Sequence, residues 1–343
     1  MAACAVAAVG CAEASSGSVS SADTGAPPSG DVVEPTDTLS SSDLVEAVDV
    51  VQGSDNNTAL AQPLDVAGPD ARAELDVPDF PKAPGSLGGD RPASYVLPDD
   101  YDPKKSWPVM LVLHGYGASG FIQDAYLGIS AEARTRGVIV ILPDGTVDTE
   151  GSQFWNGTDA CCDFGKTGVD DVAYLTGLLD EAATYFNIDA SRTYSLGHSN
   201  GAFMSYRLAC EHGDRFAGIV ALAGLMWKDG GKCPDTGKVG VLQVHGTDDD
   251  TIPYLGKLNM PTALDSAAFW ATRNGCAAGV TALETLDLDT QVAGNETKVE
   301  VFDGCPDGAA AALWTLQGGS HIPSFSGLFA EKALDFLLAQ RQE

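Results

Sequence analysis

The stretch SRTYSLGHSNGAFMSYRLACEH, residues 191–212, decides the fold of this 343-residue chain. It begins as a strand with an apolar end, turns sharply at Gly197-His198-Ser199-Asn200-Gly201, and continues as an amphipathic helix. A G-x-S-x-G pattern between a strand and a helix is a nucleophile elbow, in which the glycines permit a strained turn that raises the serine hydroxyl above a sheet. The N-terminus of the helix favours developing negative charge. The pattern therefore predicts that Ser199 is a nucleophile.

Strand and helix patterns alternate on both sides of this turn. Near-continuous apolar runs at residues 107–115 and 138–144 are typical of strands buried on both faces, and residues 122–137 between them have helical spacing. Helices are also predicted at 171–186, 202–212, 265–275 and 328–340, and strands at 191–199, 216–224, 239–246, 297–304 and 311–319. Such alternation predicts an α/β fold, with a mostly parallel sheet and helices on both faces.

The serine needs a base that accepts its proton, and reactive groups in such folds collect where parallel strands end. The chain has five histidines, and four of them lie in other motifs or elements. His114 and His198 lie in the oxyanion loop and the elbow, His212 lies at a helix end, and His245 is the last apolar-strand residue before a loop. His321 lies in GGSHIPS, a glycine-rich loop directly after a predicted strand, and we predict that it is the base. The acid that orients the base is expected in HGTDDDTIPY (residues 245–254), which offers Asp248, Asp249 and Asp250.

An acyl-transfer site also needs two backbone N–H groups directed at the oxygen that gains charge. One is expected from Asn200, directly after the nucleophile. The other is expected from Tyr116, in the loop LHGYGASG (residues 113–120) that follows an early strand. This chemistry requires no metal or cofactor.

These motifs, with FWNGTDACCDFGKTGVDDVAYL (residues 154–175), resemble the secreted esterases of the polyhydroxybutyrate depolymerase and feruloyl esterase group, within the α/β-hydrolase superfamily. The resemblance implies a serine carboxylic-ester hydrolase of α/β-hydrolase fold. It places the acid at Asp249 and the base at His321, and it implies a disulfide between Cys276 and Cys305. The substrate stays open among small esters, polyesters and esterified polysaccharides. Trp155 is interpreted either as a substrate-binding wall or as a core aromatic residue.

Six cysteines of the body are disulfide candidates: Cys161, Cys162, Cys210, Cys233, Cys276 and Cys305. An even number favours bridges in an exported chain, although spacing alone does not choose among fifteen connectivities. We expect the neighbours Cys161 and Cys162 to reach different partners, because a bridge between adjacent residues closes a strained ring. A metal site is disfavoured, because no pair of these cysteines has the usual ligand spacing.

The N-terminal part of the chain indicates export. Residues 1–11 resemble the end of a lipoprotein signal, in which Cys11 is the candidate for lipidation and thus for a membrane tether. Residues 12–90 are rich in Ser, Gly, Pro and acidic side chains, so we expect a disordered tether before a catalytic domain at 91–343. The predicted location is extracellular or on the cell surface.

The charge of the chain restricts its partners. It carries 19 basic and 48 acidic side chains, a net charge of −29, which argues against binding nucleic acid. Two other functions stay open: a serine peptidase of the same fold, and a non-catalytic surface binding protein.

Overall fold

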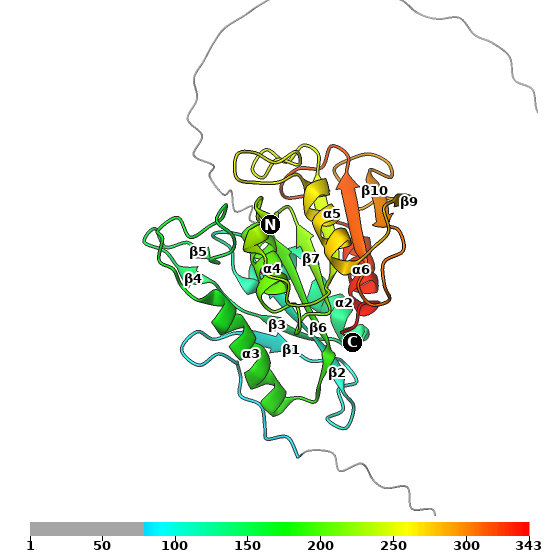
Figure 1. The fold of residues 1–343 in the computed structure, drawn as a ribbon. Coiled ribbons are helices and arrows are strands. Elements are labelled where there is room, and N and C mark those ends of the chain that lie inside the picture. Colours follow the sequence, from blue (N-terminus) through cyan, green and yellow to red (C-terminus); the bar gives the residue numbers. More distant parts are fainter. Residues whose placement is uncertain (1–78, 343) are drawn as a thin grey trace, which may run out of the picture. The chain divides into compact units, whose positions relative to one another are not determined.

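The structure, a computed structural model, describes residues 79–342, and the sheet at their centre confirms the predicted α/β fold (Figure 1). Nine strands pair in the order β1-β3-β2-β6-β7-β8-β11-β10-β9. The six strands from β3 to β11 are parallel to their neighbours, whereas β1 pairs antiparallel at one edge and β10 and β9 pair antiparallel at the other. This is the mostly parallel sheet of the α/β-hydrolase fold.

The elements have the following bounds. The strands of the large sheet are β1 (Ser94–Val96), β2 (Trp107–Leu113), β3 (Ile139–Leu142), β6 (Ile188–His198), β7 (Gly218–Leu222), β8 (Gly240–Gly246), β9 (Val280–Leu286), β10 (Thr297–Phe302) and β11 (Ala311–Leu316). A small separate hairpin consists of β4 (Thr146–Val147) and β5 (Gln153–Phe154). The helices are α1 (Gly120–Leu127), α2 (Ile129–Thr135), α3 (Asp171–Tyr185), α4 (Asn200–Glu211), α5 (Ala263–Asn274) and α6 (Gly327–Leu338), with a short 3-10 helix at Gly230–Lys232.

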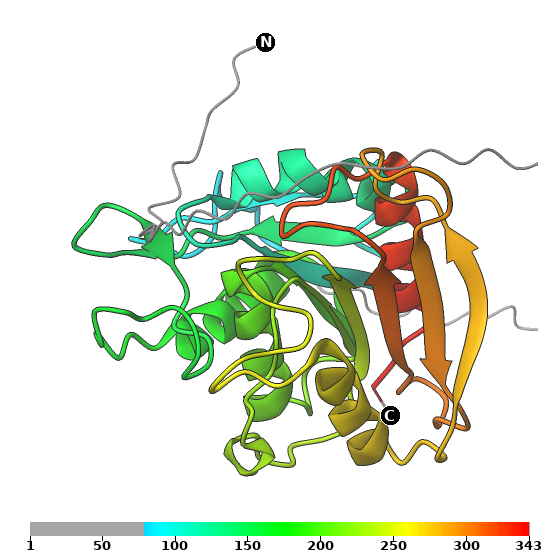
Figure 2. The same cartoon turned by 90° about the horizontal axis from the view of Figure 1, so that it is seen from above.

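Helices cover both faces of the sheet, as the sequence predicts (Figure 2). The apolar side chains of α3, α4 and α5 pack on one face, and those of α1, α2 and α6 pack on the other. The strands β2, β3, β7, β8 and β11 are therefore buried along their whole length. Burial on both faces explains why these strands are continuous apolar runs in the sequence.

Besides the short strands β1, β4 and β5, which the sequence analysis does not predict, the structure differs from the predicted elements in three places. The single helix expected at 122–137 is divided into α1 and α2 at Gly128, whose φ of 67° ends the first helix in the left-handed conformation. Strand β9 was not predicted, because it lies at the sheet edge and most of its side chains are exposed. The folded domain also begins before residue 91: Leu87 is fully buried, and the Gly88 amide donates a hydrogen bond to the Glu181 carboxylate at 2.8 Å.

Three disulfides lie within the described residues, and one of them corrects a prediction. Cys210 is bonded to Cys233, and Cys276 is bonded to Cys305 as the family resemblance implies. Cys161 and Cys162 are bonded to each other, so the expectation of different partners for them is wrong. Within residues 79–342 the other four cysteines pair among themselves, so Cys161 and Cys162 have no other cysteine partner in this part of the chain.

The expected signal segment, Cys11 and most of the expected tether lie outside the described residues. Among the helices of residues 79–342, none has the length and apolar character that crossing a membrane requires.

Helix α4 crosses the strands β2 and β6 at very short range, which requires glycine at two positions. A Cβ atom on Gly201 would overlap the carbonyl oxygen of Leu113 in β2. A Cβ atom on Gly197, at the end of β6, would overlap the carbonyl oxygen of Gly201. The two glycines of the G-x-S-x-G pattern therefore bring the helix start directly against the sheet.

We predict that Gly201→Ala lowers the free energy of unfolding by at least about 3 kcal/mol, because the added methyl group meets rigid backbone. The matched control is Gly177→Ala in the middle of α3, where a Cβ meets nothing within 4 Å. That change is expected to raise stability by about 0.5–1 kcal/mol through helix propensity. Urea denaturation of both variants measures the difference, and equal effects of the two substitutions would contradict the close-crossing argument.

Candidate active site

Ser199 occupies a strained turn between β6 and α4. Its φ of 52° and ψ of −120° are unusual for a residue with a side chain, and it is the N-cap residue of α4. Its amide donates a hydrogen bond to the Leu222 carbonyl of the neighbouring strand β7 at 2.8 Å. The turn is therefore held from both sides, and it presents the hydroxyl group at the end of the sheet where the parallel strands stop.

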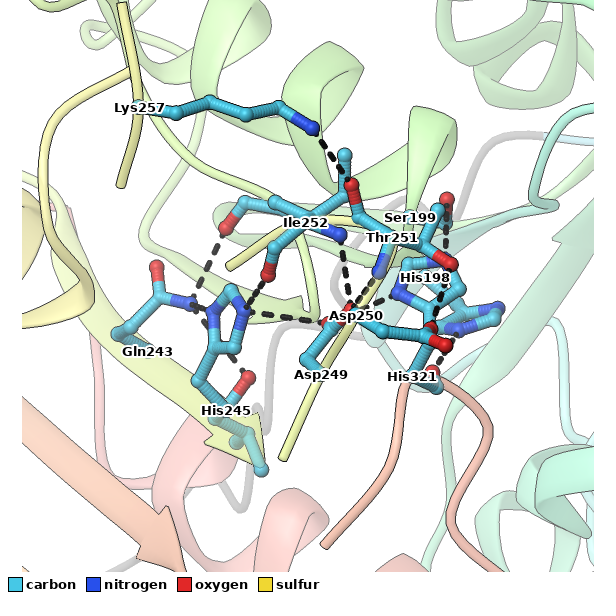
Figure 3. Close-up of polar contacts among 12 residues, drawn as sticks. His198, Ser199, Gln243, His245, Asp249, Asp250, Thr251, Ile252, Lys257 and His321 are labelled. Carbon is cyan, nitrogen blue, oxygen red and sulfur yellow. Dashed lines mark hydrogen bonds and ion pairs between the residues drawn. The ribbon is translucent and has the colours of Figure 1, made fainter. Parts of the chain in front are cut away.

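The side chains of Ser199, His321 and Asp249 form one hydrogen-bonded row (Figure 3). The Ser199 hydroxyl lies 3.0 Å from His321 Nε2, and His321 Nδ1 lies 2.8 Å from Asp249 Oδ2. The three residues follow the strands β6, β11 and β8, so separate loops bring them together. With the imidazole donating from Nδ1 to the carboxylate, Nε2 is free to accept the serine proton.

Asp249 is the member of the acidic run that the structure brings to this row. Its side chain is fully buried, whereas Asp248 and Asp250 are exposed and contact only neighbouring threonines. Burial acts to raise the pKa of Asp249, but polar contacts with His245 and His321 outweigh burial and hold the pKa far below its ordinary value. Backbone amides of Thr251 and Ile252 donate to its second oxygen at 3.0 and 2.8 Å. The carboxylate therefore stays ionised throughout the neutral pH range.

Two backbone amides near Ser199 have the freedom to bind an anionic oxygen. These are the amides of Tyr116 and Asn200, and among residues 79–342 neither of them donates a hydrogen bond to another group. Asn200 is the first residue of α4, where the helix dipole adds positive potential. The Tyr116 loop passes close to the nucleophile, because a Cβ on the preceding Gly115 would lie 3.4 Å from Ser199 Cβ. These two amides are therefore the candidates for an oxyanion hole.

The loop that carries Tyr116 is fixed by a buried histidine and by the small hairpin. His114 donates from Nδ1 to the Gly115 carbonyl at 2.7 Å and accepts at Nε2 from the Gly145 amide at 2.8 Å. Burial lowers the pKa of His114, so the neutral form that makes both bonds is favoured. The Tyr116 hydroxyl donates to Asp148, in the connection between β4 and β5, at 2.5 Å.

Trp155 lies in the core rather than on the surface of the site. Its ring is fully buried, and its indole N–H donates to the His114 carbonyl at 3.0 Å. Its backbone is clamped by the side chain of Asn200, which accepts from the Trp155 amide at 2.7 Å and donates to the Trp155 carbonyl at 2.8 Å. Of the two interpretations of Trp155, the core aromatic residue agrees with this burial.

Two further histidines contact the row, and the sequence analysis assigned no catalytic role to either of them. His198 donates from Nε2 to the backbone carbonyl of His321 at 3.0 Å, and His245 lies 3.3 Å from Asp249 Oδ2 (Figure 3). Burial is the main cause that lowers the pKa of His198 to about 4. His198 is therefore neutral at pH 7 and holds the loop of His321 by a hydrogen bond. Within residues 79–342, no cluster of three or more His, Cys, Asp or Glu has the arrangement of a metal site.

Comparison with known proteins gives relatives among esterases. The Esterase family model, described as "Putative esterase", matches residues 85–277. The chain is 27% identical over 237 residues to Feruloyl esterase B of Piromyces equi (66% of this chain, 41% of that protein). It is also 27% identical over 224 residues to Feruloyl esterase C of Emericella nidulans (62% of this chain, 70% of that protein). The chain spans 43% and 41% of the length of two of the curated relatives that it matches.

Among solved structures, the acetyl xylan esterase from Aspergillus awamori superposes with a TM-score of 0.51 at 14% sequence identity. The match covers 71% of this chain and 94% of that chain. At this level of identity the likeness bears on the fold alone.

We predict that His198 makes the protein less stable as the pH falls from 7 to 4.5. The unfolded chain binds a proton at His198 below about pH 6.5, whereas the folded protein does so only near pH 4, so protons favour unfolding in this window. The expected loss from this residue is about 2 kcal/mol at pH 4.5. His198→Gln retains an N–H donor without titrating, and urea denaturation at both pH values is expected to give a smaller loss for it than for the parent. An equal loss in parent and variant would contradict the assignment, and His212→Gln, which keeps His198, is the control.

Proposed function

Because the chain belongs to the Esterase family, whose model matches more than half of its length, we propose that it is a serine hydrolase of carboxylic esters. The observation that carries the proposal is the row of Ser199, His321 and Asp249, with hydrogen-bond distances of 3.0 and 2.8 Å. The strained serine backbone and the two adjacent free amides support the same chemistry.

The proposed reaction proceeds through an acyl-enzyme. The Ser199 oxygen attacks the ester carbonyl carbon while His321 Nε2 takes the hydroxyl proton. The amides of Tyr116 and Asn200 stabilise the oxyanion of the tetrahedral intermediate. His321 then gives its proton to the leaving alcohol, and a water molecule, activated by the same imidazole, releases the acid. Asp249 keeps the imidazole proton on Nδ1 and stabilises the imidazolium that forms.

We infer that the substrate is an uncharged ester with an aromatic or apolar group. The rings of Tyr116 and Phe164 lie 5.5 Å apart in an edge-to-face arrangement, and 37% and 70% of these residues are exposed. Tyr116 lies in the loop that supplies the candidate oxyanion amide, and Phe164 contacts its ring from the segment that follows Cys162. An ester bound at Ser199 therefore has an aromatic surface beside it. The net charge of −29 disfavours anionic substrates at low salt, and two of the relatives are named feruloyl esterases. Small esters, polyesters and esterified polysaccharides all have groups of this kind.

The proposed location is outside the cytoplasm. Three disulfides within residues 79–342 support an oxidising compartment, because the reducing conditions of the cytosol keep cysteines in the thiol form.

We predict that Ser199→Ala lowers kcat for p-nitrophenyl acetate by at least about 10⁴-fold and abolishes labelling by a fluorophosphonate probe. Ser191→Ala, at the opposite end of the strand β6, is the control and is expected to keep the activity of the parent. Undiminished hydrolysis by Ser199→Ala would refute the nucleophile. Absence of both hydrolysis and labelling in the parent would favour a non-catalytic binding protein, and faster cleavage of peptides than of esters would favour a peptidase.

We predict that Phe164→Ala raises KM for methyl ferulate by about 5-fold and leaves kcat nearly unchanged, because it removes an aromatic contact worth about 1 kcal/mol in ground state and transition state alike. KM for p-nitrophenyl acetate, whose acyl group is only an acetyl group, is expected to change less. The control is Leu283→Ala, an exposed apolar residue of the edge strand β9. Equal KM changes for both esters would contradict a contact between Phe164 and the aromatic acyl group of methyl ferulate.

A further inference from the structure

We propose that His245 is a positioning residue that fixes the carboxylate of Asp249 by clamping the turn in which it lies. The inference rests on the proposed function, since it assigns a partner to the acid of that site. His245 is the next-to-last residue of the strand β8, and its side chain is fully buried. Figure 3 shows its ring directed at the segment that contains Asp249 and Ile252, on the side of the carboxylate away from His321.

The contacts of His245 connect it to both ends of this turn. Its Nε2 lies 2.7 Å from the carbonyl oxygen of Ile252 and 3.3 Å from Asp249 Oδ2. The amide of the same Ile252 donates to Asp249 Oδ1 at 2.8 Å. The Nε2–H of His245 thus holds the residue whose amide binds one carboxylate oxygen, and the same N–H faces the other carboxylate oxygen. The carboxylate has little freedom to rotate away from His321.

A buried chain of side chains selects the form of His245 that makes these contacts. Gln243 Nε2 lies 3.1 Å from the Gly224 carbonyl and 3.1 Å from His245 Nδ1. A carbonyl oxygen only accepts hydrogen bonds, so the group of Gln243 that faces the Gly224 carbonyl must be its NH₂ group. The same NH₂ group faces His245 Nδ1 and donates to it, so Nδ1 is an acceptor. The hydroxyl of buried Tyr206, in α4, donates to Gln243 Oε1 at 2.6 Å and completes the orientation. The single proton of His245 is therefore on Nε2, facing Ile252 and Asp249.

Because the pair is buried, loss of the His245 donor is expected to disturb the position of the Asp249 carboxylate. Asp249 and His245 have no exposed side-chain surface, so water does not replace a donor that is lost. Small displacements of a catalytic group reduce rates strongly, by up to about 10²-fold for 1 Å. A loosened Asp249 would leave the imidazole of His321 without a fixed orientation toward Ser199.

The test is a double-mutant cycle between His245 and Asp249, measured as kcat/KM for p-nitrophenyl acetate. In the parent background, His245→Phe keeps the bulk of the ring but removes the donor, and we expect a loss of about 10- to 100-fold. In the Asp249→Asn background we expect less than about twofold further loss, because His245 acts through the carboxylate. Equal losses in both backgrounds would overturn the inference, because a residue that only supports the fold contributes independently of Asp249.

A conservative variant and a stability control complete the test. His245→Gln places an amide N–H near the position of Nε2, and it is expected to recover activity to within about fivefold of the parent. Leu242→Ala, on the same strand and also fully buried, lowers stability without touching this chain of contacts and is expected to keep kcat/KM. Equal impairment of His245→Gln and His245→Phe would overturn the donor role.

If His245→Phe does not fold, Gln243→Leu replaces it in the same cycle. This change keeps His245 but removes the group that selects its tautomer, and we expect at least about fivefold loss that is absent in the Asp249→Asn background. A full loss in both backgrounds would again overturn the inference. Should Asp249→Asn alone retain the activity of the parent, the proposed acid is wrong as well, so failure of the function and failure of the positioning role give different results.

Discussion

The structure depends on one steric constraint, the close approach of helix α4 to the strands β2 and β6. Gly197 and Gly201 leave room for backbone only, and the chain between them must turn within three residues. Ser199 consequently takes a backbone conformation that side-chain-bearing residues rarely adopt, and its hydroxyl lies above the sheet. The same approach brings the loop of Gly115 beside the serine, so the nucleophile and both candidate oxyanion amides are placed by one packing contact.

A second constraint follows from charge. The carboxylate of Asp249 is ionised and has no exposed surface, which is costly unless donors surround it. The structure supplies two backbone amides and two histidines for this purpose. Histidines thus occur on both sides of the acid, and only His321, the more exposed one, faces the serine. The buried histidines His114, His198 and His245 differ from it in that each donates from one ring nitrogen to a backbone carbonyl.

The features that the sequence predicts correctly are those that a local residue pattern determines, namely the central strands and the elbow. The strands at the centre of the sheet are buried on both faces and read as apolar runs, and the elbow lies between a strand and a helix that were both predicted. The local pattern leaves Asp248, Asp249 and Asp250 open as the acid, and the family resemblance selects Asp249. In the structure Asp249 is the buried member of the three, and its carboxylate contacts His321. The contacts of His198 and His245 join groups that a linear pattern does not connect; His198 meets a carbonyl 123 residues away. The pairing of Cys161 with Cys162 likewise depends on which other cysteines meet, which is a property of the folded chain.

The site has an inner layer, the hydrogen-bonded row and the two candidate oxyanion amides, which determines reactivity. Its outer layer, the exposed rings of Tyr116 and Phe164, is free to vary. Asn200 joins the inner layer to the core: its amide is a candidate oxyanion donor, while its side chain clamps the backbone of buried Trp155. A change at Trp155 therefore disturbs the reaction geometry as well as the packing. The rings of Tyr116 and Phe164 are exposed and contact each other, and the Tyr116 hydroxyl donates to Asp148 in the connection between β4 and β5. Substitutions there alter the surface that an ester meets and leave the hydrogen-bonded row intact, so substrate preference is free to diverge among proteins that share this row.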